Sequence, residues 1–145
     1  MDDISQLFIQ DHRRCDEMFV AMEQAFSQGE WSRAEKTLDG FIHAMEHHFN
    51  VEEERLFPVL EQASSQANGA VRVMMMEHVQ MRHLFKTLCT AMQQRSKETI
   101  LGITDTLLVT MQQHNMKEEN ILYPLADRFV AELGEEIALG ITGSG

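Results

Sequence analysis

Two segments of the chain carry a histidine and a glutamate four residues apart. His48 precedes Glu52 in the first segment, and His114 precedes Glu118 in the second. In a helix such residues lie one turn apart on the same face, with about 5–6 Å between their Cβ atoms. Imidazole nitrogens and carboxylate oxygens at this spacing are typical ligands of metal ions. The two segments therefore predict two half-sites for metal on two helices.

Both segments belong to an internal repeat with an offset of 66 residues. Residues 48–58 and 114–124 share the histidine, two consecutive glutamates, a leucine and the closing proline. His12 and His78 have the same offset. Each half of the chain thus contributes one early histidine and one His-x-x-x-Glu pair, and we expect one shared site where the halves meet.

The rest of the sequence predicts helix almost throughout. The chain has only two prolines and is rich in residues that favour helix. Apolar residues at steps of three and four predict helices over 4–27, from about 32 to the proline at 58, over 70–94 and over 97–132. Four helices of about 25 residues, each about 38 Å long, predict an all-α, up-down-up-down four-helix bundle with an internal two-fold repeat of helix pairs.

Length and composition exclude several classes of protein. A chain of 145 residues that is 43% hydrophobic fits one domain, which we assign to residues 1–139, with 140–145 as a flexible tail. A net charge of −11 with scattered Lys and Arg argues against nucleic acid and anionic membranes as partners. The N-terminal residues lack the basic and apolar regions typical of a secretory signal, no apolar run is long enough for a membrane span, and Cys15 and Cys89 form no CxxC motif. A cytoplasmic location is therefore expected.

Six ionisable residues lie on apolar helix stripes in this prediction. A single histidine on such a stripe is more often a hydrogen-bonded core residue than a ligand. Six groups in two matching sets are harder to explain as packing, because burying an unpaired charge costs several kcal/mol. A metal ion would compensate this cost, and the mixture of imidazole and carboxylate suits iron or manganese better than closed tetrahedral zinc, with iron as the expected metal and manganese or zinc as the alternatives. The predicted ligands are His12, His48, Glu52, His78, His114 and Glu118.

With these residues the chain resembles the hemerythrin-like (HHE cation-binding) domains. The resemblance covers nearly the whole length, through His12, the His48-Phe49-x-x-Glu52-Glu53 segment, Glu77-His78, and His114-x-x-x-Glu118 followed by Leu122-Tyr123-Pro124. It implies a non-haem di-iron centre inside a four-helix bundle, with two irons per chain. By this resemblance Glu52 and Glu118 bridge the irons, and the four histidines bind them terminally.

The chain differs from the oxygen-carrying members of that family at Arg82. Those members have a second histidine at this place, four residues after the first on the third helix. Arginine stays protonated and does not ligate, so one iron is expected to take water, a carboxylate or a substrate, and reversible oxygen carriage is in question. The repeat mate of Arg82 is Asp16, and we predict an Arg82–Asp16 contact near the site.

Several neighbours of the predicted ligands are expected beside the site. Glu53 and Glu119 directly follow the glutamates, and Glu119 is an alternative to Glu118 because the oxygen carriers use His-x-x-x-x-Asp on the last helix. Symmetry with Glu52 favours Glu118. Cys15 is expected as a small buried thiol, with a redox-sensitive role as the alternative. Tyr123 is expected to pack, since its repeat mate is Phe57, with a radical-forming phenol as the alternative.

The function expected from this site is the binding, sensing or reduction of a small oxidant. Dioxygen, nitric oxide and peroxide are the candidates, and an oxidoreductase activity toward them is left open. The alternatives are iron storage or delivery, and a helical interaction module in which the metal is structural. The redox partner and the oligomeric state do not follow from the sequence.

Overall fold

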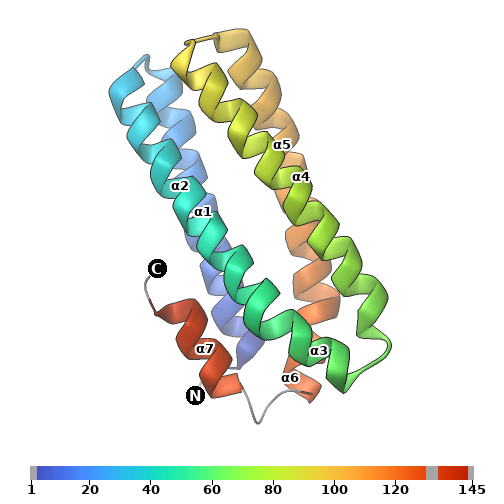
Figure 1. Ribbon diagram of the computed structural model, residues 1–145. Coiled ribbons are helices and arrows are strands. Elements are labelled where there is room, and N and C mark those ends of the chain that lie inside the picture. Colours follow the sequence, from blue (N-terminus) through green and yellow to red (C-terminus); the bar gives the residue numbers. More distant parts are fainter. Residues whose placement is uncertain (1–2, 130–133, 144–145) are drawn as a thin grey trace.

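Four long helices lie side by side in the computed structural model, which describes residues 3–129 and 134–143 (Figure 1). They are α1 (Ile4–Ser27), α2 (Trp31–Val51), α4 (Ala67–Gln93) and α5 (Lys97–Lys117). Helix α1 packs against α2, α4 packs against α5, and the pairs meet through α2 and α4. All elements in the described residues are helices, as the sequence predicts.

Two wide turns interrupt the helices that carry the glutamates. The π-helical turns η1 (Glu52–Leu56) and η2 (Glu118–Leu122) follow α2 and α5 directly, and the short helices α3 (Phe57–Ala63) and α6 (Tyr123–Phe129) continue beyond them. Proline follows at 58 and 124. Because proline has no N–H and its ring clashes with the carbonyl four residues back, a wider turn before it relieves the backbone. Both glutamates therefore begin a π-helical turn.

The internal repeat is visible in the backbone. Elements α5, η2 and α6 have the bounds of α2, η1 and α3 shifted by 66 residues. The turns within each helix pair agree too, since the repeat mates Gly29 and Arg95 have positive φ angles of 72° and 52°. The guanidinium of Arg95 lies 5.6 Å from the ring centroid of Trp31. Each half thus builds the same helix pair, as predicted.

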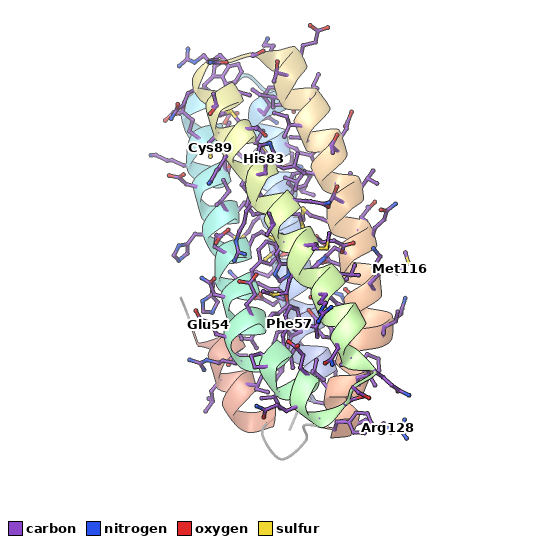
Figure 2. All side chains as sticks on the ribbon, turned by 45° about the vertical axis from the view of Figure 1, so that its right-hand side comes forward. Glu54, Phe57, His83, Cys89, Met116 and Arg128 are labelled. Atoms are coloured by element: carbon purple, nitrogen blue, oxygen red, sulfur yellow. The ribbon has the colours of Figure 1, made fainter. Side chains whose placement is uncertain are left out.

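The bundle interior contains two hydrophobic clusters with the polar residues between them. One cluster includes Phe19, Phe41 and Phe85 near the turns of the helix pairs, and the other includes Phe8 and Leu60 near α3 and α6. Side chains occupy the space between the helices along their length (Figure 2). On α1, His12 follows a residue of one cluster and precedes a residue of the other. The candidate site therefore lies at mid-height in the bundle, enclosed from both ends.

The structure corrects three boundaries predicted from the sequence. The helix expected to end at the proline at 58 continues through α3 to Ala63. Helix α4 begins at Ala67 rather than Ala70. Residues 140–142, predicted to belong to a flexible tail, lie in α7 (Gly134–Thr142), which packs against α1 and α2. Ile141 is buried in the hydrophobic cluster near α3 and α6, and this apolar contact was not recognised in the sequence. Residues 144 and 145 of the predicted tail and residues 130–132 of the predicted fourth helix lie outside the described residues.

No helix within residues 3–129 and 134–143 is both long enough and apolar enough to cross a membrane.

The backbone at two glycines predicts opposite effects of the same substitution. Gly29 has a φ of +72°, where a Cβ costs about 1–2 kcal/mol, whereas Gly102 lies within α5, where alanine is favoured over glycine by about 1 kcal/mol. Neither site has another atom within 4 Å of an added Cβ. In urea unfolding, Gly29→Ala should lower the free energy of unfolding and Gly102→Ala should raise it. Changes of the same sign would contradict the turn geometry.

Candidate metal centre

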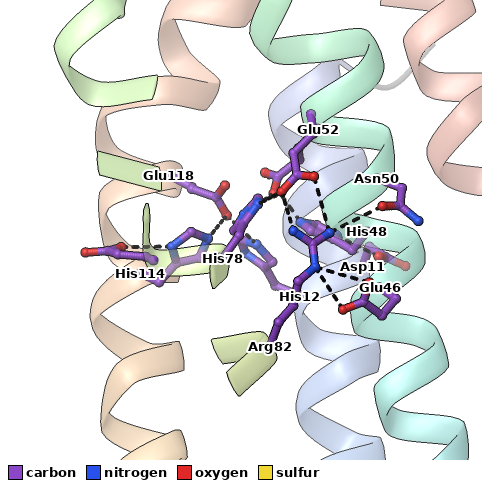
Figure 3. A network of polar contacts seen from close by, with 12 residues as sticks. Asp11, His12, Glu46, His48, Asn50, Glu52, His78, Arg82, His114 and Glu118 are labelled. Atoms are coloured by element: carbon purple, nitrogen blue, oxygen red, sulfur yellow. Dashed lines mark hydrogen bonds and ion pairs between the residues drawn. The ribbon is translucent and has the colours of Figure 1, made fainter. Parts of the chain in front are cut away.

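Six side chains from all four long helices and the two π-helical turns converge at mid-height in the bundle (Figure 3). Each is at most 5% exposed. Ligand atoms of Glu52, His78, His114 and Glu118 lie within 4.8 Å of one another, and so do those of His12, His48 and Glu118. The structure therefore brings together all six residues singled out in the sequence, in two adjoining groups that share Glu118.

Both glutamates lie between the two pairs of histidines. The carboxylate of Glu52 has one oxygen 3.2 Å from His78 Nε2 and the other 3.5 Å from His48 Nε2. Oε1 of Glu118 lies 3.0 Å from His12 Nε2 and 3.2 Å from His114 Nε2. Each carboxylate thus faces one histidine from each half of the chain, which is the position a bridging ligand needs.

Each of the four histidines is held from behind by a further carboxylate. We call Asp11, Glu53, Glu77 and Glu119 the outer carboxylates. Each accepts a hydrogen bond from a histidine Nδ1, an arrangement that leaves Nε2 free to bind an ion. The Nδ1–oxygen distances are 2.7 Å for His48–Asp11, 2.6 Å for His78–Glu53, 2.9 Å for His114–Glu77 and 2.7 Å for His12–Glu119.

The positions of the outer carboxylates bear on one alternative that the sequence left open and reveal two contacts that it did not predict. Glu119 contacts His12 from outside, at Nδ1, whereas Glu118 reaches the centre, so the geometry favours Glu118 over Glu119 as the inner carboxylate. Asp11 and Glu77 were missed as contacts of the histidines. They are repeat mates beside His12 and His78, but each contacts the histidine of the neighbouring helix, which depends on how the helices pack.

Three outer carboxylates are balanced by a cation. Asp11 pairs with Arg14 at 2.9 Å, Glu77 with Lys117 at 2.5 Å and Glu53 with Arg82 at 2.8 Å. Among the described residues, the fourth, Glu119, pairs with His12 but with no Lys or Arg, and its charge acts on the acidic Asp16. Burial and Glu119 raise the pKa of Asp16 against the attraction of His12. The two halves of the centre therefore differ in charge at their edges.

Arg82 does not contact Asp16, so that prediction was wrong. The guanidinium donates to Glu46 at 3.0 Å (Figure 3) and to Glu53 at 2.8 Å, and it lies 5.2 Å from the ring centroid of Phe49. Phe49 in turn stacks on the ring of His78 at 3.9 Å. The repeat places Arg82 beside α2 and η1 and places Asp16 near η2, so equivalent positions lie on different flanks of the bundle.

Tyr123 reaches the centre with its hydroxyl, which corrects the expectation that it only packs. The fully buried phenol donates a hydrogen bond to Glu52 Oε2 at 2.7 Å, and its oxygen lies 3.0 Å from Glu118 Oε1. It is also 3.0 Å from His12 Nε2 and 3.2 Å from His48 Nε2. Burial and the two glutamates hold the pKa of Tyr123 well above its usual value. A buried phenol needs a polar partner, and that signal was available in the sequence.

Cys15 lies beside the site as a core residue. It is 1% exposed and packs in the cluster with Phe19. Burial and the neighbouring Asp11 raise the pKa of the thiol to about 12, so the reactive thiolate is disfavoured. Of the other histidines, His43 and His83 are exposed.

The site fits a cation because several of its polar atoms are otherwise unpartnered. Among the described residues, Glu52 Oε1, His78 Nε2, His114 Nε2 and Glu118 Oε2 are buried without a hydrogen-bond partner. Each such atom costs about 1–3 kcal/mol. All four belong to the group around His78 and His114. One ion at that position would engage them together, and these donor types suit a metal ion.

Removing an outer carboxylate should weaken metal binding without removing a ligand. Glu53 holds the Nδ1 of His78, so Glu53→Ala frees the imidazole to rotate, and affinity should fall about 10- to 100-fold. The neighbouring Glu54 is exposed and provides the matched control, Glu54→Ala. Competition with a chelator of known affinity measures both. Equal affinities of the two variants would show that the outer contact has no effect on the metal.

The metal-free protein should lose stability as the pH rises. Burial disfavours the charged form of His48, but Glu52 and Asp11 outweigh it and raise its pKa to about 10; for His114, burial is outweighed chiefly by Glu118, and the pKa rises to about 9. Protonated histidines therefore contribute stability fully below the unfolded value of 6.5, and this is lost as the pH rises through 9 and 10.

Urea unfolding of metal-free protein across this range tests the expectation. The free energy of unfolding should decrease from near pH 6.5 toward pH 10. Metal-loaded protein is the control, because its histidines bind the ion rather than protons and the decrease should be smaller. A metal-free protein that gains stability over this range would show that the histidines are neutral when folded.

Comparison with models of protein families agrees with this geometry. Residues 3–126 match the hemerythrin HHE cation-binding domain, a span that includes all six converging residues and Tyr123 but ends before α7. Comparison with curated proteins gave no significant match, and comparison with solved structures gave none either. Since the matched span covers most of the chain, the protein belongs to the hemerythrin HHE cation-binding domain family.

Proposed function

We propose that the chain is a non-haem di-iron protein that binds, senses or reduces a small oxidant such as dioxygen, nitric oxide or peroxide. The observation that carries this proposal is the pair of adjoining ligand groups, because both glutamates face histidines from both groups. Two carboxylates placed in this way suit a pair of ions better than a single one. His48, His12, His78 and His114 would bind terminally.

The ligand atoms support iron as the metal. Four imidazole nitrogens and two carboxylates, without thiolate, are the mixture that non-haem iron uses, whereas structural zinc favours closed tetrahedral sites rich in cysteine. When bound, an iron pair supplies the electrons for binding or reducing the oxidant. The chain's own residues orient the ligands, through the outer carboxylates, and keep water away.

The surroundings suit a small apolar ligand. Phe49, Phe57 and Met81 are at most 1% exposed, and the two aromatic rings stack on His78. An apolar gas crosses such a core readily, whereas a charged reductant does not, because burying its charge is costly. This favours a small uncharged oxidant over a larger polar substrate.

We also propose that the four long helices form an up-down-up-down bundle. This order is supported by the tight turns after α1 and α4 and by the packing of α1 on α2 and of α4 on α5. In this order, each of the four candidate histidine ligands lies on a different long helix around the shared centre.

Stopped-flow mixing of reduced, iron-loaded protein with dioxygen or nitric oxide tests the function. We expect a rapid change in the visible spectrum with at least one of the two, and two irons per chain by elemental analysis. Zinc-loaded protein is the control, since it has the same ligands but no electrons to donate. If neither gas changes the spectrum of the iron-loaded protein, the proposed function is contradicted and the metal has a structural role.

A further inference from the structure

The two halves of the centre differ in one buried aromatic side chain. Tyr123 and Phe57 are repeat mates that directly follow η2 and η1. Their rings lie against equivalent histidines, with centroids 5.5 Å apart for Tyr123 and His12 and 5.8 Å apart for Phe57 and His78. Tyr123 carries a hydroxyl where Phe57 carries hydrogen. One half of the centre therefore has an oxygen donor that the other half lacks.

The distances from the hydroxyl oxygen of Tyr123 to the nearby candidate ligand atoms match those between neighbouring ligands of one metal ion. Its distances to one oxygen each of Glu52 and Glu118 and to Nε2 of His12 and His48 run from 2.7 to 3.2 Å. Ligand atoms about 2.1 Å from one octahedral ion lie about 3 Å from each neighbouring ligand. An axial ligand has four such neighbours, the number found here.

The four neighbours of the phenol oxygen are also close to one another in pairs. His12 Nε2 lies 3.0 Å from Glu118 Oε1, and His48 Nε2 lies 3.5 Å from Glu52 Oε2. Four atoms spread tetrahedrally around an oxygen at hydrogen-bond distance would be about 5 Å apart. The shorter pairs instead fit four equatorial positions beside one axial position. The phenol oxygen thus has the position of a further ligand and not the position of the metal ion itself.

We propose that Tyr123 is a protein ligand of the metal ion held by His12 and His48, in addition to the two glutamates. Its proton, now donated to Glu52, passes to water as the metal–oxygen bond forms, so tyrosine binds as phenolate. Tyrosinate is an established ligand type for protein-bound iron. The ion held by His12 and His48 then has five protein ligands.

The open positions then belong to the ion held by His78 and His114. Phe57 offers that ion no donor atom, and the guanidinium of Arg82 is bound outward to Glu46 and Glu53. The unpartnered buried atoms of the centre also lie in this group. A small oxidant would therefore bind here. This placement rests on the proposed function, whereas the tyrosine ligand does not.

Resonance Raman spectroscopy of the iron-loaded ferric protein, without oxidant added, tests the tyrosine ligand. A ferric phenolate absorbs in the visible region, and excitation there enhances the ring vibrations of the bound tyrosinate. The chain contains a single tyrosine, so such vibrations can come from Tyr123 alone. Tyr123→Phe should abolish both the band and the vibrations while two irons remain bound.

Two results would overturn the assignment. Wild-type ferric protein with two irons but without tyrosinate vibrations would show that the phenol does not ligate. One iron in the wild type and two in Tyr123→Phe would show that the phenol excludes an ion instead of holding it. In Tyr123→Phe, position 123 carries phenylalanine, as its repeat mate Phe57 does, so the ring still fills its place in the core.

Exchanging the repeat mates tests the position of the open half. In the double variant Phe57→Tyr with Tyr123→Phe, the phenol moves beside His78. We expect tyrosinate vibrations to return and the reaction with dioxygen or nitric oxide to slow relative to Tyr123→Phe alone, because the phenolate takes an open position. Returned vibrations with an unchanged rate would overturn the placement. If the wild type shows tyrosinate vibrations but reacts with neither dioxygen nor nitric oxide, the proposed function is contradicted and the ligand assignment remains.

Discussion

The central constraint on this bundle is that ionisable groups are buried at mid-height without access to water. Glu52, Glu118 and His78 are fully buried, and an unpaired charge at such a depth costs several kcal/mol. Successive shells of polar groups compensate this cost. The glutamates face the histidines, the histidines donate outward to carboxylates, and three of those carboxylates pair with cations nearer the surface. Without a metal the inner layer remains incomplete, as its unpartnered atoms show.

Most of the fold and the inner residues could be predicted from the sequence because their signals are local or repeated. Helix periodicity predicted the approximate bounds of α1, and the 66-residue offset identified His12 and His78 as equivalent positions without any knowledge of packing. The outer carboxylates Asp11 and Glu77 were not predicted as histidine contacts. Their sequence neighbours are histidines, but their hydrogen bonds go to the adjacent helix, and that depends on helix rotation and spacing.

The two wrong expectations at the site have one physical origin. Arg82 was paired with Asp16, and Tyr123 was assigned to packing, because each was compared with its repeat mate. A repeat predicts that equivalent residues have equivalent surroundings, not that they touch. Arg82 and Asp16 therefore lie on different flanks, each beside a carboxylate of η1 or η2. Tyr123 has the ring position of Phe57, but its hydroxyl extends to the glutamates.

These differences are what make the two halves chemically distinct on a nearly symmetric backbone. On the half with His78, a cation balances Glu53, and the aromatic neighbour Phe57 has no donor. On the half with His12, Glu119 lies near another acid, and a phenol reaches the ligand atoms. Negative charge and an extra oxygen donor on the same side would stabilise the higher charge state of an ion bound there, since opposite charges attract more strongly in a buried site. On the proposed assignment, an ion on the other side would have fewer protein ligands and a less negative environment. Duplication thus accounts for the shared backbone of the two halves, and substitutions such as Tyr123 opposite Phe57 make their two groups of candidate ligands chemically different.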